Sequence, residues 1–142
     1  MKIAIGNDHA GYELKLVLAD WLKEQGYDVK DYGTDSSEAA DYPDFMHPVA
    51  ASVEKGEFDF GVLICASGQG ASITANKHQG IRATLCWLPE IAKLARSHND
   101  ANIVCLPGRF LEKDTAIDIL KVFLDTSFDG GRHQRRIDKV PM

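Results

Sequence analysis

Short apolar runs alternate with longer segments of helical periodicity along the whole chain. The first run covers residues 2–6 (KIAIG), and the segment after it repeats apolar residues at helical spacing until Gly26. An apolar run of a few residues predicts a strand, and a repeat of three or four positions predicts a helix. The same pattern predicts further strands over 27–32, 59–65, 81–86 and 101–106. It predicts the remaining helices from Pro43 to Gly56, over 70–78, over 89–98 and around 116–124.

This alternation predicts an α/β fold. Five strands joined by helices favour right-handed crossovers and a five-stranded, mostly parallel sheet flanked by helices, which is a doubly wound, Rossmann-like architecture. The run 59–65 (DFGVLIC) is largely apolar, as expected of a strand buried on both faces. A length of 142 residues suits one domain, so we expect residues 1–142 to form a single unit with a basic C-terminal tail, 130–142.

Composition narrows the range of partners. The net charge is −5 and the one basic cluster is short, which argues against nucleic acid and against an anionic membrane. No apolar stretch is long enough to span a bilayer and the N-terminus does not resemble a signal peptide, so a cytoplasmic location is expected. Three widely spaced cysteines without a C-x-x-C pair favour neither a disulfide framework nor a zinc site, and we expect no metal.

Polar and reactive side chains follow three of the predicted strands. The first strand ends in Gly-Asn-Asp-His (6–9), the third in Cys-Ala-Ser-Gly-Gln-Gly (65–70) and the fifth in Leu-Pro-Gly-Arg (106–109). In doubly wound sheets, ligands bind beyond the carboxyl ends of the strands, at a switch point of the topology. If the first and third strands are neighbours, these side chains converge on one crevice.

The glycine-rich stretch after Cys65 indicates an anion site rather than a nucleotide site. A dinucleotide fingerprint from Gly68 needs Gly or Ala at position 73, where Ile73 stands, and the Gly-Lys pair of a P-loop is absent. A turn that leads into a helix N-terminus nevertheless exposes N–H groups that favour an oxyanion. We therefore expect no nucleotide cofactor.

Cys65 is the cysteine best placed for chemistry. A helix N-terminus or a nearby cation lowers the pKa of a thiol, which would make Cys65 a nucleophile or a general base. Burial as a small apolar residue is the alternative for Cys65, and it is our interpretation of the other two cysteines. Among the histidines, His9 directly follows a strand, whereas His47 and His78 are interpreted as solvated side chains.

His98 presents a geometric problem. It lies at the end of the predicted helix 89–98, which runs about 15 Å back toward the opposite edge of the sheet at ~1.5 Å per residue. His98 is therefore either a helix-terminal residue that interacts with the helix dipole or a residue supplied to the site by a second subunit. The second interpretation predicts an obligate homodimer.

Arg132 and Arg136 lie one helical turn apart if the segment GGRHQRR coils. Arginine side chains donate paired hydrogen bonds that fit phosphate oxygens, so two on one face predict a phosphate clamp. The alternative is a solvated basic tail.

Six stretches carry these features in order over almost the whole chain: GNDHAGYELK, DYGTDSSEAADYPDF, ICASGQGASITANK, IRA, SHNDANIVCLPGR and GGRHQRR. Together they resemble the family of type B ribose-5-phosphate isomerases and the related galactose- and allose-6-phosphate isomerases. The resemblance implies an aldose–ketose isomerase of phosphorylated sugars that needs no metal or cofactor. It also implies a homodimer or a dimer of dimers whose subunits share active sites.

The resemblance further implies roles for single residues. Cys65 would move a proton between C1 and C2 of the sugar, and His98 would assist ring opening together with Ser67. The positions that would hold the sugar and its phosphate are Asp8, His9, Ala66, Ser67, Gly68, Gln69, Gly70, Asn99, Arg109, Arg132 and Arg136. The chemistry is coherent in itself, because a thiolate supplies a base and the N–H groups of 66–70 supply donors to an enediolate oxygen. Asp8 is the alternative base.

Two positions depart from the family pattern. Members commonly carry Gly-Thr where this chain has Ala66-Ser67, so the hydroxyl is kept while alanine restricts the backbone. Gln69 stands where the residue is often small or apolar. These differences bear on the sugar: ribose 5-phosphate is the expected substrate, and allose or galactose 6-phosphate is the alternative. A sugar-phosphate sensor without activity is a further alternative, which the presence of a candidate base disfavours.

Overall fold

The computed structural model describes residues 1–142 and contains one five-stranded sheet with the strand order β2-β1-β3-β5-β4. The strands are β1 (Lys2–Asn7), β2 (Asp28–Asp31), β3 (Phe60–Cys65), β4 (Ala83–Leu85) and β5 (Ile103–Pro107). All neighbouring strands pair in parallel. The doubly wound α/β class is therefore confirmed, and the sheet is wholly parallel.

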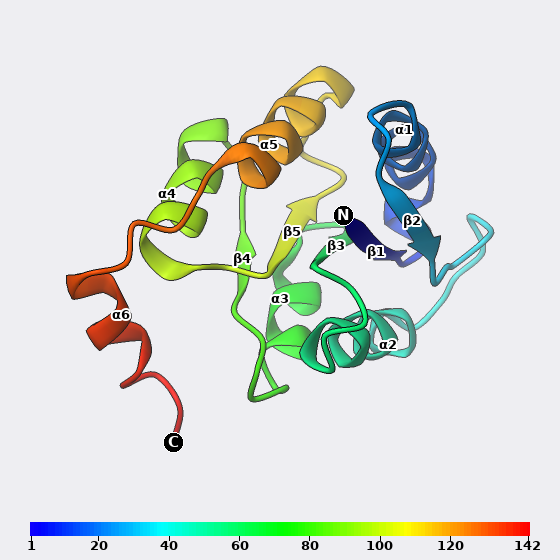
Figure 1. Ribbon diagram of the computed structural model, residues 1–142. Helices are drawn as coiled ribbons and strands as arrows, with labels where there is room; N and C mark the ends of the chain where they lie inside the picture. Colours follow the sequence, from blue (N-terminus) through cyan, green and yellow to red (C-terminus); the bar gives the residue numbers. More distant parts are fainter.

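Helices cover both faces of the sheet (Figure 1). They are α1 (Tyr12–Glu24), α2 (Tyr42–Glu54), α3 (Gln69–Ala75), α4 (Pro89–Asn99), α5 (Lys113–Asp125) and α6 (Arg132–Ile137). Helices α1, α4 and α5 pack on one face in a core that contains Ile64, while α2 and α3 pack on the other in a core that contains Leu63. Successive strand residues point to opposite faces, so the apolar run of β3 supplies both cores. None of the helices is both long and apolar enough to cross a membrane.

Several predicted elements differ by a residue or two at their ends, and two neighbouring ones are shortened by a common contact. The helix predicted over 70–78 ends at Ala75, and the strand predicted over 81–86 contracts to Ala83–Leu85. Asn76 explains part of both differences, because its side-chain amide donates to the Ala83 carbonyl at 2.9 Å and accepts from the Ala83 N–H at 2.8 Å. The Asn76 side chain thus satisfies the backbone hydrogen-bonding groups at the start of β4, which is an edge strand of the sheet.

The basic tail contains a helix. Gly130 and Gly131 have φ of +68° and +59°, a conformation that favours glycine, and α6 follows immediately. His133 and Ile137 are its buried residues. Figure 1 shows α6 at the end of a long connection from α5, beside α4 and away from the sheet. The condition for a helical turn between Arg132 and Arg136 is therefore met.

The strand order places the three reactive strand ends side by side. β3 lies between β1 and β5, with Asn7 paired to Ile64 and Cys65 paired to Pro107. The expected neighbourhood of the first and third strands is confirmed. The candidate site lies at the carboxyl ends of these three strands.

Candidate active site

Cys65 is the last residue of β3, with 5% of its surface exposed. Its carbonyl accepts a hydrogen bond from the Gly108 N–H at 2.8 Å, and the Ala66 carbonyl accepts one from the Arg109 N–H at 3.1 Å. These bonds join the end of β3 to the loop that follows β5. The thiol is therefore fixed by backbone contacts, and Arg109 starts from the same edge of the sheet.

The loop 66–70 turns the chain from β3 into α3. Gly68 has φ of +76°, and a Cβ there would lie 2.4 Å from Leu85 Cδ1, so only glycine fits. Ala66 does not share this conformation, because Asp100 is the one non-glycine residue with positive φ. The departure from the family at Ala66 therefore introduces no left-handed strain. The Gly70 and Ala71 N–H groups, in the first turn of α3, have no acceptor within the helix and are available to an oxyanion.

The side chains of the loop and its wall leave polar groups free. Ser67 Oγ accepts from the Gln69 N–H at 3.4 Å, which leaves the hydroxyl proton available for donation. The ring of Tyr42, at the start of α2, lies against Gly70, where an added Cβ would come within 2.7 Å of it. Tyr42 is not among the predicted site residues. The only signal in the sequence is its position before Pro43, where a helix is predicted to begin.

Asp8 and His9 shape the same edge from β1. Asp8 Oδ1 accepts from the N–H groups of Ala10 and Gly11 at 3.0 and 3.2 Å, so it caps the short 3₁₀ turn His9–Gly11. His9 Nδ1 accepts from the Ala40 N–H at 3.2 Å. In the neutral imidazole the proton must then lie on Nε2, which makes this nitrogen a donor for an anionic ligand. Asp8 has one carboxylate oxygen committed to structure, which weakens its case as the base.

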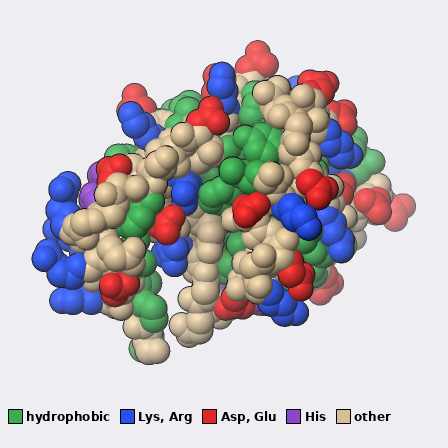
Figure 2. All heavy atoms as spheres, in the orientation of Figure 1, with side chains coloured by type: hydrophobic (Ala, Val, Ile, Leu, Met, Phe, Trp, Pro, Cys, Tyr) green, Lys and Arg blue, Asp and Glu red, His purple; other side chains and the backbone are tan.

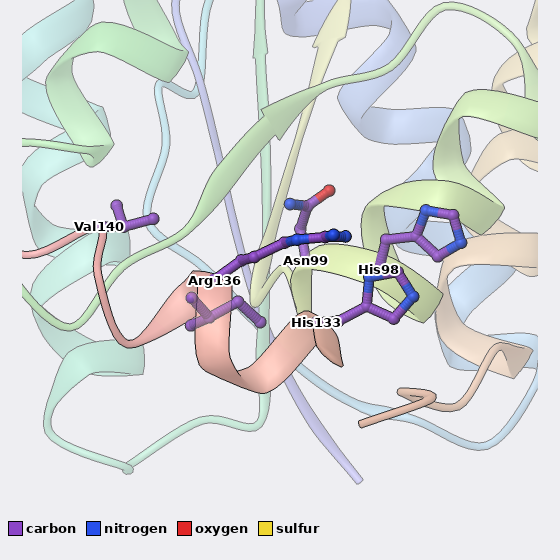
Figure 3. Close-up of a pocket in the computed structure, with 6 residues that line it drawn as sticks. His98, Asn99, His133, Arg136 and Val140 are labelled. Atoms are coloured by element: carbon purple, nitrogen blue, oxygen red, sulfur yellow. The ribbon is translucent and has the colours of Figure 1, made fainter. Parts of the chain in front are cut away.

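A second group of predicted site residues lies where α4 ends beside α6. His98 and Asn99 line a cavity of about 260 Å³ together with His133, Arg136, Ile137 and Val140. Figure 3 shows the His98 and His133 rings lying over one another and Arg136 extending from α6 toward Asn99. The ring centroids are 4.2 Å apart and the planes meet at 13°. His133 is absent from the predicted set, although its position between the two predicted arginines of the tail is a signal.

Positive charge gathers around this second group. Figure 2 shows Lys and Arg side chains clustered over α6, with histidine beside them. Arg132 and Arg136 are both exposed and stand four residues apart on α6. Arg136 lines the cavity and Arg132 does not. The predicted phosphate clamp therefore has one arginine at the cavity and one at the first turn of the helix.

The two groups lie at opposite ends of the parallel strands, the Cys65 group at the carboxyl ends and the His98 group toward the amino ends. The Gly61 N–H donates to the Asn102 carbonyl, three residues beyond Asn99, and Cys65 follows Gly61 by four strand residues. At ~3.3 Å per strand residue, about 13 Å of β3 separates these levels. One chain therefore assembles Cys65 with the loop 66–70 and the ends of β1 and β5, and it does not bring His98, Asn99 or Arg136 to them.

Two arginines hold the end of α4 in place. Arg96 Nη1 donates to Asp100 Oδ1 at 2.8 Å and to the Ala101 carbonyl at 2.7 Å. Arg82 donates through Nε to the Asn99 carbonyl at 3.0 Å and through Nη2 to the Asp100 carbonyl at 2.9 Å. Asp100 itself has φ of +45°, so this turn depends on its partners. We call these contacts of Arg82 and Arg96 with residues 99–101 the Asp100 clamp. It fixes the backbone that carries His98 and Asn99. The sequence offers no signal for it beyond the presence of the charged residues.

Replacement of Asp100 by asparagine tests the Asp100 clamp. Asparagine tolerates positive φ but removes the negative charge beside the buried Arg96, so we expect the free energy of unfolding to fall by roughly 2–3 kcal/mol. Urea denaturation measures this change. Asp118→Asn, at an exposed position of α5, is the matched control and should change stability little. An equal loss in both variants would contradict the clamp.

Protonation of His133 is disfavoured in the folded protein. Burial and the charges of His98, Arg132 and Arg136 lower its pKa from 6.5. Below pH 6.5 the unfolded chain therefore binds a proton more readily than the folded one, and the free energy of unfolding falls until the pH reaches the lowered pKa. Denaturation at pH 7.5 and 5.5 should show a smaller acid-induced loss for His133→Gln than for the unsubstituted protein. Equal losses would contradict this assignment.

Thiol reagents should distinguish the three cysteines. Burial raises the pKa of Cys86 to about 11 and that of Cys105 to about 12, so both remain thiols at pH 8. Because the thiolate is the nucleophile, iodoacetamide at pH 8 should label Cys65 first. Peptide mapping by mass spectrometry checks the site, with Cys65→Ala as the unlabelled control. Comparable labelling of Cys86 or Cys105 in the folded protein would contradict the prediction.

One cluster near the second group offers possible metal ligands. Atoms of His98, Asp129 and His133 lie within 4.8 Å of one another. The two imidazole rings are nearly parallel, however, so their in-plane lone pairs do not converge on one point. The stacked arrangement therefore does not favour chelation.

The fold and these side chains define a doubly wound α/β protein with its reactive groups at the carboxyl edge of the sheet. The chain belongs to the Ribose/Galactose Isomerase family, whose model matches residues 3–140. It is 45% identical over 139 residues to "Ribose-5-phosphate isomerase B" of Escherichia coli strain K12, which covers 98% of this chain and 93% of the relative.

Solved structures agree with this assignment. A ribose 5-phosphate isomerase from Thermotoga maritima has a TM-score of 0.97 at 51% identity, covering 99% of this chain and 97% of the other. Ribose-5-phosphate isomerase B from Mycoplasma genitalium, with bound ribulose-5-phosphate, has a TM-score of 0.95 at 42% identity, covering 98% and 93%. The resemblance seen in the sequence is confirmed at the level of the family.

Proposed function

We propose that this protein is an aldose–ketose isomerase that interconverts ribose 5-phosphate and ribulose 5-phosphate, with residues 1–142 forming one domain. The observation that carries the proposal is the full-length likeness to the Mycoplasma genitalium enzyme, whose structure holds ribulose-5-phosphate. A fixed thiol beside a glycine-rich loop with free amides supports the same reaction class. We place the activity in pentose phosphate metabolism in the cytoplasm.

Cys65 is the base in the proposed reaction. Its thiolate removes the proton from C2 of the open-chain aldose, and the C1 carbonyl oxygen takes up the negative charge of the resulting enediolate. The same proton returns to C1, while the C2 hydroxyl loses its proton and the C1 oxygen gains one, so the aldehyde becomes an alcohol and C2 becomes the ketone. The amides at the start of α3 stabilise the enediolate oxygen.

The phosphate group supplies binding energy away from the reacting carbons. His9 Nε2, Arg109, Arg132 and Arg136 are the proposed donors to the sugar phosphate, and Ser67 with His98 assists ring opening. Binding of a remote phosphate orients C1 and C2 against the base without participating in the proton transfer. No step in this scheme requires a metal or a cofactor.

A complete site requires two subunits in this proposal, as a homodimer or a dimer of dimers. The separation of the Cys65 group from the His98 group within one chain supports it. Large apolar side chains stand exposed near both groups, with Phe110 at 76% beside Arg109 and Val140 at 68% beside α6. A hollow of about 800 Å³ also lies between residues 76–84 and 134–142, on the flank of α6. These surfaces suit a partner that delivers its own Cys65 edge to the α4–α6 cavity.

Parallel kinetics on three sugar phosphates test the function. Purified protein in the presence of a chelator should convert ribose 5-phosphate with a kcat/KM at least ~10-fold above that for allose 6-phosphate or galactose 6-phosphate, since an extra hydroxymethylene has to be accommodated. Preference for a hexose would keep the enzyme class and change the substrate. No turnover of any of the three by folded protein would contradict the proposal and favour a sensor.

A further inference from the structure

Three polar side chains outside both site groups form a connected array. His47 lies on α2, Glu54 is the last residue of α2, and His78 follows α3. His47 Nδ1 and His78 Nε2 are 2.8 Å apart, and His78 Nδ1 is 3.2 Å from Glu54 Oε2. Neither histidine has a role in the proposed isomerase reaction, although His78 also lines the hollow on the flank of α6. The solvated role expected for both does not explain their contact.

Hydrogen bonding fixes the orientation of His78. Glu54 Oε1 accepts from the Gly80 N–H at 2.8 Å, which anchors the carboxylate. An ionised carboxylate only accepts, so the proton of neutral His78 lies on Nδ1 and the Nε2 lone pair points at His47. His47 Nδ1 therefore carries the proton between the two rings and donates it to His78 Nε2. A cation that binds imidazole can take the place of that proton.

We propose that His47 and His78 form a binding site for a divalent transition-metal ion of the Zn²⁺, Ni²⁺ or Cu²⁺ type, with Glu54 orienting His78 from behind. Neutral imidazole suits these ions, and a ligating histidine ordinarily donates its second N–H to a carboxylate or a carbonyl. Two Zn–N bonds of about 2.0–2.1 Å at a tetrahedral angle place the nitrogens roughly 3.3 Å apart. His47 is exposed, so a small rotation of its side chain opens the 2.8 Å contact to that distance.

The site joins two elements that the fold otherwise packs through apolar contacts. α2 and α3 share the core on one face of the sheet, and the segment after α3 leads to the edge strand β4. An ion bound between His47 and His78 ties α2 to this segment. Because the unfolded chain does not hold the two imidazoles together, binding stabilises the folded protein, by an amount that grows with the logarithm of the free ion concentration once this exceeds the dissociation constant.

Direct binding of Zn²⁺ and Ni²⁺ to the untagged full-length protein tests the proposal. Titration calorimetry at pH 7.5 in a non-chelating buffer should give one ion per chain, and the melting temperature should rise with the ion. His47→Gln and His78→Gln should each weaken binding at least ~10-fold, and Glu54→Gln should weaken it by about 10-fold while keeping both ligands. Circular dichroism verifies that each variant is folded.

Two controls separate this site from the histidines of the candidate active site. His133→Gln removes the competing cluster and should leave the binding constant unchanged. Bound Cu²⁺ should show two coordinated imidazole nitrogens in its electron paramagnetic resonance spectrum, reduced to one or none in His47→Gln. No saturable binding below 1 mM, binding that survives both His47→Gln and His78→Gln, or binding lost in His133→Gln would each overturn the proposal. Isomerase activity does not enter any of these readouts, so failure here is independent of the proposed function.

Discussion

Replacement of Cys65 by alanine is expected to lower kcat for ribose 5-phosphate by roughly 10³–10⁴-fold, the upper range for loss of a positioned acid–base group. The thiol ends a strand that is held on both sides by β1 and β5, so the backbone of the variant keeps its place. Alanine fits the space of cysteine without steric conflict. KM should change little, because the groups proposed to hold the phosphate are untouched. Steady-state kinetics with matched circular dichroism spectra measure the effect.

The matched control for this experiment is Cys105→Ala. Cys105 is buried on β5, the strand next to β3, and has no part in the proposed reaction. It should retain activity within a fewfold, although it loses some stability. Full activity of Cys65→Ala would exclude the thiol as the base. Asp8→Asn would then be the next variant, since Asp8 Oδ2 is not used in the cap of the 3₁₀ turn.

Two inactive variants should restore activity when their subunits are mixed. Cys65→Ala and His98→Asn each disable every site of their own homodimer in a shared-site enzyme. A mixed dimer contains one site with both defects and one with neither. Random assortment makes half of the dimers mixed, so about a quarter of the unsubstituted activity should return. From a background reduced by orders of magnitude, this is a large recovery.

Subunit exchange by mild denaturation and refolding prepares the mixture. The control mixes Cys65→Ala with the double variant Cys65→Ala/His98→Asn, which cannot form an intact site and should stay inactive. Native mass spectrometry confirms that mixed dimers are present. Mixed dimers without recovered activity would contradict the shared site, and a monomeric protein with full activity would contradict it as well.

The sequence predicted the elements because local patterns governed them. The apolar run before Cys65 must be buried, and the glycines after it permit a turn that other residues do not. Two of the boundaries that differ from prediction, the end of α3 and the start of β4, are set by a contact between these elements. Asn76 bonds to Ala83 across seven residues, and it trims both the helix and the strand predicted there. A contact between two elements does not change the hydrophobic periodicity of either one, so the sequence pattern cannot predict it.

The candidate site also contains residues that the sequence predicted and residues that only the structure revealed. Cys65, the loop 66–70 and His9 stand at strand ends, where chain order and parallel topology already place them. The contacts made by Tyr42, His133 and Arg82 come from packing between elements distant in the chain, and no local pattern encodes them. The pairing of His47 with His78 is of the same kind, because it joins α2 to the segment after α3.

The sequence by itself determined the fold class, the reactive strand ends and the family, because each depends on residue type and order along the chain. The position of His98 far from Cys65 was also already expected from the length of the helix that ends there, and the structure agrees. Only the tertiary structure decided which strands are neighbours, how α6 stacks His133 on His98, and which side chains clamp Asp100. The physical reason is that these relations depend on distances between segments, which packing of the two cores sets and the order of residues does not.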